Sequence, residues 1–359
     1  MRLSARLLCG LGSTAARWVP PRRAWLRVRP ALIAAGVGTT LAFGYLSVRE
    51  VDVGDAWTAF QRSRAWWFVP GLATLTLAVF LRIVRWRYLF APIARPRLGA
   101  TTSAYLVGQF FNNFLPANVA GDFMRTLDAS RSGSTRANAL STVILDRLIG
   151  TAALGGVAVV STLPAIDRFH LAAAYAGVVA FFVVSVVMLR AMLEPSVLAA
   201  VERLLARIGL SRLSPSLDRL SGSLVEFRNR KRLLLELLSV ALVVQIMRIG
   251  VHILFARALG LHVEAAYFFL FVPLLAVIVS LPISLNGIGV REGVGILLFG
   301  MVGLDRASAF ALQFGTYLVA VGVSLIGGVV FLARIPVRRA RSRTEPPTED
   351  PRRPRRSTE

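Results

Sequence analysis

The sequence predicts an all-α polytopic membrane protein with about eight transmembrane helices, a re-entrant hairpin and an inverted repeat. Of its 359 residues 55% are hydrophobic, and the mean hydropathy index is +0.62, which is far above that of a soluble domain. A helix needs about 20 apolar residues to cross a hydrocarbon core of roughly 30 Å. Runs of that length lie at 31–48, 68–90, 137–162, 171–193, 233–260, 264–284 and 307–333.

The distribution of charge predicts the orientation. Residues 1–30, 194–232 and 334–359 are rich in arginine, whereas acids balance bases in 49–66. Basic segments stay on the cytosolic side, so we expect a multi-pass plasma-membrane protein with both termini in the cytosol. An even number of crossings is then required, and residues 288–303 are the eighth candidate. The net charge of +23 reflects this topology, and no nucleic acid is expected as a partner.

Composition divides the chain into three parts. Residues 1–30 are expected to be a basic cytosolic tail that is retained, because no small-residue cleavage site follows the 31–48 run. Residues 31–335 form the membrane domain, in which 195–232 alternates leucine with charged residues, as an interfacial helix would. Residues 336–359 are rich in proline and charge, which predicts a disordered cytosolic tail.

The stretch "FFNNFLPANVAGDFMR", which begins at residue 110, starts as an apolar run and then breaks. Pro116 and Gly121 interrupt the helix, and in lipid the freed backbone groups must be satisfied by protein or trapped water. The side-chain amides of Gln109, Asn112 and Asn113 can do this. A new helix beginning at Asp122 would present free N–H donors and a positive dipole end, which favour an anion.

Arginines precede and follow this stretch, at Arg95 and Arg97 and at Arg131 and Arg136. Because both flanks are basic, we expect residues 110–133 to enter and leave on the cytosolic side as a re-entrant hairpin.

An internal repeat links this stretch to a second one. "LPANVAGDFMR" at 115–125 resembles "LPISLNGIGVRE" at 281–292, and each precedes a G-x-x-R-A-x-A pattern that opens a long apolar run. The first copy enters the membrane from the cytosol and the second from outside. This is the pattern of an inverted repeat, which in transporters places the substrate site near the midplane.

Ionisable residues at membrane depth are the remaining site candidates. Arg248 is expected to face the protein interior, whereas Arg82 lies near a cytosolic end and is expected to snorkel. Asp146 and Arg147 are expected to take different partners, because neighbouring side chains diverge by about 100° on a helix. Structural pairing between helices is the alternative for Asp146 and Arg147. The predicted substrate-binding residues are Asn113, Pro116, Gly121, Asp122, Arg125, Asp146, Arg147, Arg248, Asn286, Gly287, Gly289, Arg291 and Glu292.

The sequence offers little for redox or metal chemistry. Cys9 is the only cysteine, and the three histidines, His170, His252 and His262, have no metal-ligand spacing. No P-loop is present, and "GIGVREG" is not the dinucleotide fingerprint. We therefore expect no catalytic residue, no metal and no cofactor.

Four segments resemble a known family: "RIVRWRYLF" (82–90), "NNFLPANVAGDFMR" (112–125), "ILDRLIG" (144–150) and "PISLNGIGVREG" (282–293). They are similar to the membrane region of lysylphosphatidylglycerol synthases and flippase-like integral membrane proteins. The resemblance covers about residues 30–335 and implies a flippase-like membrane domain. Where many relatives carry an arginine in the last span, this chain has Gln313. The aminoacyl-transfer domain that bifunctional relatives append is expected to be absent.

The predicted function is the translocation of a phospholipid or a polyprenyl-phosphate-linked lipid across the cytoplasmic membrane, and two alternatives stay open. In such a lipid translocase an anionic headgroup rests between the two broken helices while the lipid tails stay in the bilayer. The first alternative is a membrane-embedded transferase in lipid or cell-envelope glycan synthesis, with Asp122 or Glu292 as the general base. The second alternative is an accessory subunit. The expected partner is a lipid with an anionic headgroup, and a second copy of the chain or a lipid-synthesis enzyme stays open as another.

Overall fold

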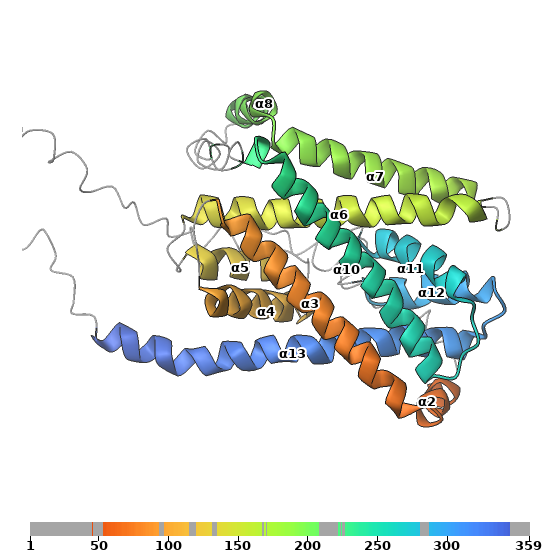
Figure 1. Cartoon of the computed structure of the whole chain (residues 1–359). Helices are drawn as coiled ribbons and strands as arrows, with labels where there is room; N and C mark the ends of the chain where they lie inside the picture. The colour runs from red at the N-terminus through yellow and green to blue at the C-terminus, as the bar shows by residue number, and fades with distance from the viewer. Residues whose placement is uncertain are drawn as a thin grey trace, which may run out of the picture.

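The part of the chain that the structure describes is built from helices alone (Figure 1). The structure is a computed structural model, and it describes residues 45, 53–92, 97–114, 120–130, 135–166, 169, 171–207, 222, 224, 227–280 and 287–344. The α-helices are α2 (Val53–Gln61), α3 (Phe68–Phe90), α4 (Leu98–Phe114), α5 (Ala120–Ser130), α6 (Arg136–Thr162), α7 (Ala172–Met192), α8 (Pro195–Arg207), α10 (Lys231–Ala258), α11 (Ala265–Ser280), α12 (Val290–Gly300) and α13 (Arg306–Thr344).

Five described helices are long and apolar enough to cross a membrane: α3, α6, α7, α10 and α13. Each coincides with a predicted span, so the all-α membrane fold is confirmed. The predicted span at 31–48 and the tail at 1–30 lie outside the described residues, apart from Tyr45. Helix α8 begins the predicted interfacial segment, and α13 runs on to Thr344, into the tail that was expected to be disordered.

In two places the chain forms a pair of short helices where a single membrane-spanning helix could otherwise lie. Helices α4 and α5, of 17 and 11 residues, lie where the re-entrant hairpin is predicted, although α4 begins well before residue 110. Helices α11 and α12, of 16 and 11 residues, form the second pair. An 11-residue helix is about 16 Å long. The crossing expected at 288–303 is therefore the short helix α12, which is too short to span the core alone.

The two pairs pack reciprocally against the two long helices. Helix α4 packs on α13 and α11 packs on α6, whereas α5 packs on α6 and α12 packs on α13. In Figure 1 the pairs lie toward opposite ends of α6 and α13. The units α3–α6 and α10–α13 are thus related by an approximate two-fold, and this supports the predicted repeat.

The repeat has a constant register over most of each unit. Residue numbers differ by 166 between Gly121 and Gly287 and between Arg125 and Arg291. The buried faces of α3 and α10 follow the same separation. The matching buried residues are Gly71 with Leu237, Ile83 with Ile249, Arg85 with Val251, Trp86 with His252, Leu89 with Phe255 and Phe90 with Ala256.

Helices α3 and α10 are equivalent in the two units and run antiparallel. Phe255 near the end of α10 packs against Phe68 and Gly71 near the start of α3, and the Arg64 N–H donates to the Ala258 carbonyl at 2.7 Å. When equivalent helices are antiparallel, one unit is turned over relative to the other. The packing therefore supports an inverted repeat, while the side of the membrane that each end faces stays a prediction.

Two hydrophobic cores occupy the two halves of the fold. Core 1 surrounds Phe271 and Phe299, and core 2 surrounds Trp86 and Phe227. Helix α10 contributes Leu237 and Ala241 to core 2 and its residues from 249 onward to core 1. The polar side chains of Gln245 and Arg248 lie between these positions. The middle of α10 thus carries its polar residues at the junction of the two cores.

Candidate functional site

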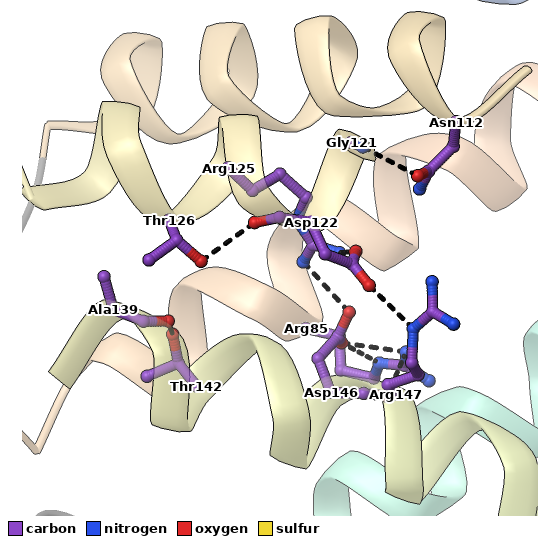
Figure 2. Close-up of polar contacts among 10 residues, drawn as sticks. All are labelled: Arg85, Asn112, Gly121, Asp122, Arg125, Thr126, Ala139, Thr142, Asp146 and Arg147. Atoms are coloured by element: carbon purple, nitrogen blue, oxygen red, sulfur yellow. Dashed lines mark hydrogen bonds and ion pairs between the residues drawn. The ribbon is translucent and has the colours of Figure 1, made fainter. Parts of the chain in front are cut away.

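The buried carboxylate of Asp146, on α6, lies at the centre of an ion-pair network (Figure 2). Arg85 of α3 donates through Nε to Asp146 Oδ1 at 2.9 Å and through Nη2 to the Asp146 carbonyl at 3.1 Å. Arg125 of α5 donates through Nη2 to the other oxygen, Oδ2, at 3.0 Å. Asp146 is 4% exposed, so these two arginines satisfy and neutralise a charge that burial alone would strongly disfavour.

A second carboxylate extends the network. Asp122 of α5 accepts from Arg147 Nε at 2.7 Å and lies 3.6 Å from Arg125 Nη1. Asp146 and Arg147 are neighbours in sequence, but side chains diverge by about 100° per residue on a helix, so they take different partners, as expected. We call Arg85, Asp122, Arg125, Asp146 and Arg147 the ion-pair network. Its most open member is Arg147, whose side chain is 48% exposed.

Aromatic rings hold Arg125 in place. Its guanidinium carbon lies 4.3 Å from the centroid of the Trp86 ring and 4.4 Å from that of Tyr105. Cation–π contacts with α3 and α4 therefore add to the ion pairs with α5 and α6. Arg125, a predicted substrate ligand, is here buried and paired with acids.

The break before α5 is closed by backbone contact and an amide. A Cβ atom built at Gly121 would collide with the Gly108 carbonyl oxygen, so α4 and α5 meet at two glycines. Asn112 Oδ1 accepts from the Gly121 N–H at 2.9 Å and satisfies one free donor of the α5 N-terminus. Asn112 is one of the three amides expected to satisfy the broken backbone. Pro116 lies outside the described residues.

The break before α12 uses backbone conformations that favour glycine. Gly287 and Gly289 have φ angles of 77° and 80°, in the left-handed region. The Gly289 N–H donates to Glu292 Oε2 at 2.6 Å, so the buried Glu292 carboxylate caps α12. Arg291 stacks over Tyr317 of α13, 4.5 Å from the ring centroid. Asn286 is outside the described residues.

A second group of cations surrounds Arg248, which lies where the two cores meet on α10. The guanidinium of Arg248 interacts electrostatically with those of Arg82 and Arg291, and we call these three residues the arginine cluster. Within the described residues, neither Arg82 nor Arg248 forms an ion pair with a carboxylate. The side chains of Arg82 and Arg248 also have exposed surface, although both residues lie within spans.

The sequence missed two residues of this region. Arg85 was not among the predicted site residues, and Arg82 was expected to snorkel. Two signals point to them. Arg82 and Arg85 are three residues apart in "RIVR", which places both on one helix face, and Arg82 precedes Arg248 by the same 166 positions that separate Arg125 from Arg291.

Comparison with known proteins assigns a family. The model of the lysylphosphatidylglycerol synthase TM region matches residues 32–328, which is most of the chain. No match is found among curated proteins. The matched range includes the ion-pair network, the arginine cluster and both broken-helix pairs. The chain belongs to the family of the lysylphosphatidylglycerol synthase TM region, a family of integral membrane proteins involved in lipid synthesis or translocation.

Proposed function

We propose that this protein is a lipid translocase that moves a phospholipid or a polyprenyl-phosphate-linked lipid across the plasma membrane. The observation that carries the proposal is the reciprocal packing of the broken pairs α4–α5 and α11–α12 on α13 and α6. Transporters built from inverted repeats place broken helices around a central site and expose it alternately to each side by rocking one unit against the other.

The charges fit a site for a polar headgroup. Six arginines (Arg82, Arg85, Arg125, Arg147, Arg248 and Arg291) interact with one another or with three carboxylates (Asp122, Asp146 and Glu292). Charges at membrane depth are costly, and those that are kept commonly line the path of a substrate. Under this proposal the lipid tails stay in the bilayer while the headgroup passes through the charged region.

The ion-pair network suggests how substrate and conformation are coupled. Asp122 lies on the short helix α5, and it bonds to the half-exposed Arg147 of α6. An anionic headgroup that reaches Arg147 competes with Asp122 for the same guanidinium. Losing this bond weakens the tie between α5 and α6, and a shift of α5 against α6 is the movement that rocking needs.

Translocation needs no bond to be made or broken, and the proposal assigns no catalytic residue, metal or cofactor. A membrane-embedded transferase and an accessory subunit are the competing functions, and each gives a different result in a reconstituted system.

The test uses the full chain in proteoliposomes that contain a fluorescent anionic phospholipid. A membrane-impermeant reductant measures the outward movement of the lipid, and mass spectrometry of the recovered lipid detects covalent change. Faster movement than in protein-free vesicles, with the lipid unchanged, supports translocation. A lipid altered by group transfer would establish a transferase. If neither movement nor chemistry occurs across phosphatidate, phosphatidylglycerol and a polyprenyl phosphate, the proposal is wrong.

A further inference from the structure

Arg82 is exposed on the side of α3 that faces the protein. Residues three, four and seven positions away share its helix face. Ala78, Val79, Arg85, Trp86 and Leu89 occupy five of these positions and are buried, and Leu75 at the sixth is half-buried. A side chain in the middle of a buried stripe does not point into lipid. Its exposure therefore means that solvent reaches it between the helices, and snorkelling is not needed to explain it.

Arg248 occupies the same environment on α10. Ala241, Val251, His252 and Phe255 share its face and are buried, Val244 and Gln245 on the same face are half-buried, and Arg248 itself is exposed. It is 18th in a helix of 28 residues, too far from either end to reach the interface easily. The two arginines therefore open onto space between helices from opposite units of the repeat.

The two-fold relation brings these arginines close together. Gly71 of α3 packs against Phe255 of α10, and the two helices are antiparallel. When residues are counted along each helix from this contact toward its middle, Arg82 and Arg248 are offset by only about one helical turn from facing each other. Arg291 of α12 completes the arginine cluster and interacts electrostatically with Arg248. Like charges this close repel one another, and an anion held between them removes the repulsion.

The number of charges indicates which anion fits. Within the part of the chain that the structure describes, no carboxylate forms an ion pair with Arg82 or Arg248, so these two residues bring two positive charges to the cluster, and arginine does not lose its proton in proteins. A phosphate monoester carries about 1.5 to 2 negative charges at neutral pH, whereas a phosphodiester carries about one. The monoester compensates more of this positive charge, and its three terminal oxygens can accept from several guanidinium groups at once.

We propose that the arginine cluster is the binding site for a doubly charged phosphate, the terminal phosphate of a lipid headgroup, held across the two-fold between Arg82 and Arg248 with Arg291 as the third ligand. This rests on the proposed function, because it names the headgroup chemistry that the translocase selects. Arg125 is not a ligand in this state, since Asp122 and Asp146 already neutralise it.

The test compares lipid retention by the purified full chain in native mass spectrometry. The lipids are phosphatidate (a monoester), phosphatidylglycerol (a diester) and phosphatidylcholine, at equal concentrations, and inorganic phosphate is titrated as a competitor. The variants are Arg82→Gln and Arg248→Gln. The matched control is Arg87→Gln, because Arg87 is also exposed on α3 but points about 140° away from Arg82.

We expect the wild type to retain phosphatidate over phosphatidylglycerol. We expect both cluster variants to retain phosphatidate at least about tenfold more weakly, which is the effect of losing a charge-assisted hydrogen bond, while Arg87→Gln retains it normally. Equal retention of the two anionic lipids by the wild type would overturn the preference for a double charge. Unchanged retention by Arg82→Gln and Arg248→Gln would overturn the site.

Further measurements distinguish a binding role of Arg82 from a structural role, and distinguish failure of the binding site from failure of the proposed translocation. Without ligand, Arg82→Gln should melt at or above the wild-type temperature, because it removes repulsion; a lower melting temperature would indicate a structural role and count against the site. Binding of inorganic phosphate without any lipid would show a site for free phosphate and overturn the lipid assignment. If the protein retains phosphatidate but does not move it across the membrane of proteoliposomes, translocation is refuted and the binding site is not. If Arg82→Gln transports lipid at the normal rate, the binding site is refuted and translocation is not.

Discussion

Arg125 and Arg291 stand 166 positions apart in equivalent short helices, and each places its guanidinium over a tyrosine, Tyr105 at 4.4 Å and Tyr317 at 4.5 Å. Their electrostatic surroundings differ. Arg125 meets Asp122 and Asp146, whereas the residue 166 positions after Asp122 is Ile288. The equivalent arginines of the two units therefore have different acidic neighbours, Asp122 and Asp146 for Arg125 and Glu292 for Arg291.

Removing the central carboxylate should destabilise the fold. Asp146→Asn leaves Arg85 and Arg125 without their shared counter-charge in a buried site, and breaking such a pair costs about 3–5 kcal/mol. We expect a clear fall in melting temperature in detergent. Glu264→Gln is the control, since Glu264 is an exposed acid. If the two variants have the same melting temperature, the network does not stabilise the fold.

Replacing Arg125 by lysine should impair both stability and function. Lysine provides a point charge and cannot bond to Asp146 and Asp122 while stacking flat between Trp86 and Tyr105. We expect Arg125→Lys to lower the melting temperature and to slow lipid movement in proteoliposomes. Retention of both properties would show that any cation suffices at this position.

Arg291→Lys should separate function from stability. Arg291 is half-buried, so lysine keeps its charge near solvent at small structural cost but loses bidentate contact with a phosphate. We expect near-normal melting with slower lipid movement. Arg87→Lys, on the outer side of α3, is the control for both assays. Transport by Arg291→Lys at the wild-type rate would remove Arg291 from the proposed site.

The contact between α4 and α5 should not tolerate a methyl group. In Gly108→Ala the new Cβ would lie 2.8 Å from the Gly121 carbonyl oxygen, whereas at Gly99 in the same helix nothing lies within 4 Å. We expect Gly108→Ala to destabilise the protein and slow transport. Gly99→Ala should be neutral or slightly stabilising, because alanine is favoured over glycine in helices by about 1 kcal/mol. Equal melting temperatures would argue against a tight contact.

Much of the fold could be predicted from the sequence because long apolar runs end at charged or polar residues. Helices α3, α6, α7, α10 and α13 begin within two residues of the predicted spans. The start of α4 was missed because threonine, serine, glutamine and asparagine interrupt its apolar pattern. The crossing at 288–303 was overestimated, because counting crossings ignores that Gly287 and Gly289 shorten the helix that follows.

The site was predictable only in part. Asp146, Arg147 and Arg248 stand out because charge within an apolar run is rare. The partnership of Arg85 with Asp146 joins residues 61 positions apart, and it depends on how α3 packs on α6. Arg82 lies close enough to a helix end for snorkelling to be the default expectation, and only the burial of its neighbours on α3 shows which way it points.

The most direct test of alternating access around the arginine cluster is the labelling of Arg248→Cys from each side of the membrane. The background is Cys9→Ser, which removes the only native cysteine. A membrane-impermeant thiol reagent is applied to right-side-out and to inverted vesicles. If Arg248 lies in a central, solvent-reached space that opens to each side in turn, the cysteine reacts from both sides. Labelling from neither side, as for a lipid-facing residue, or from one side only, would contradict the account.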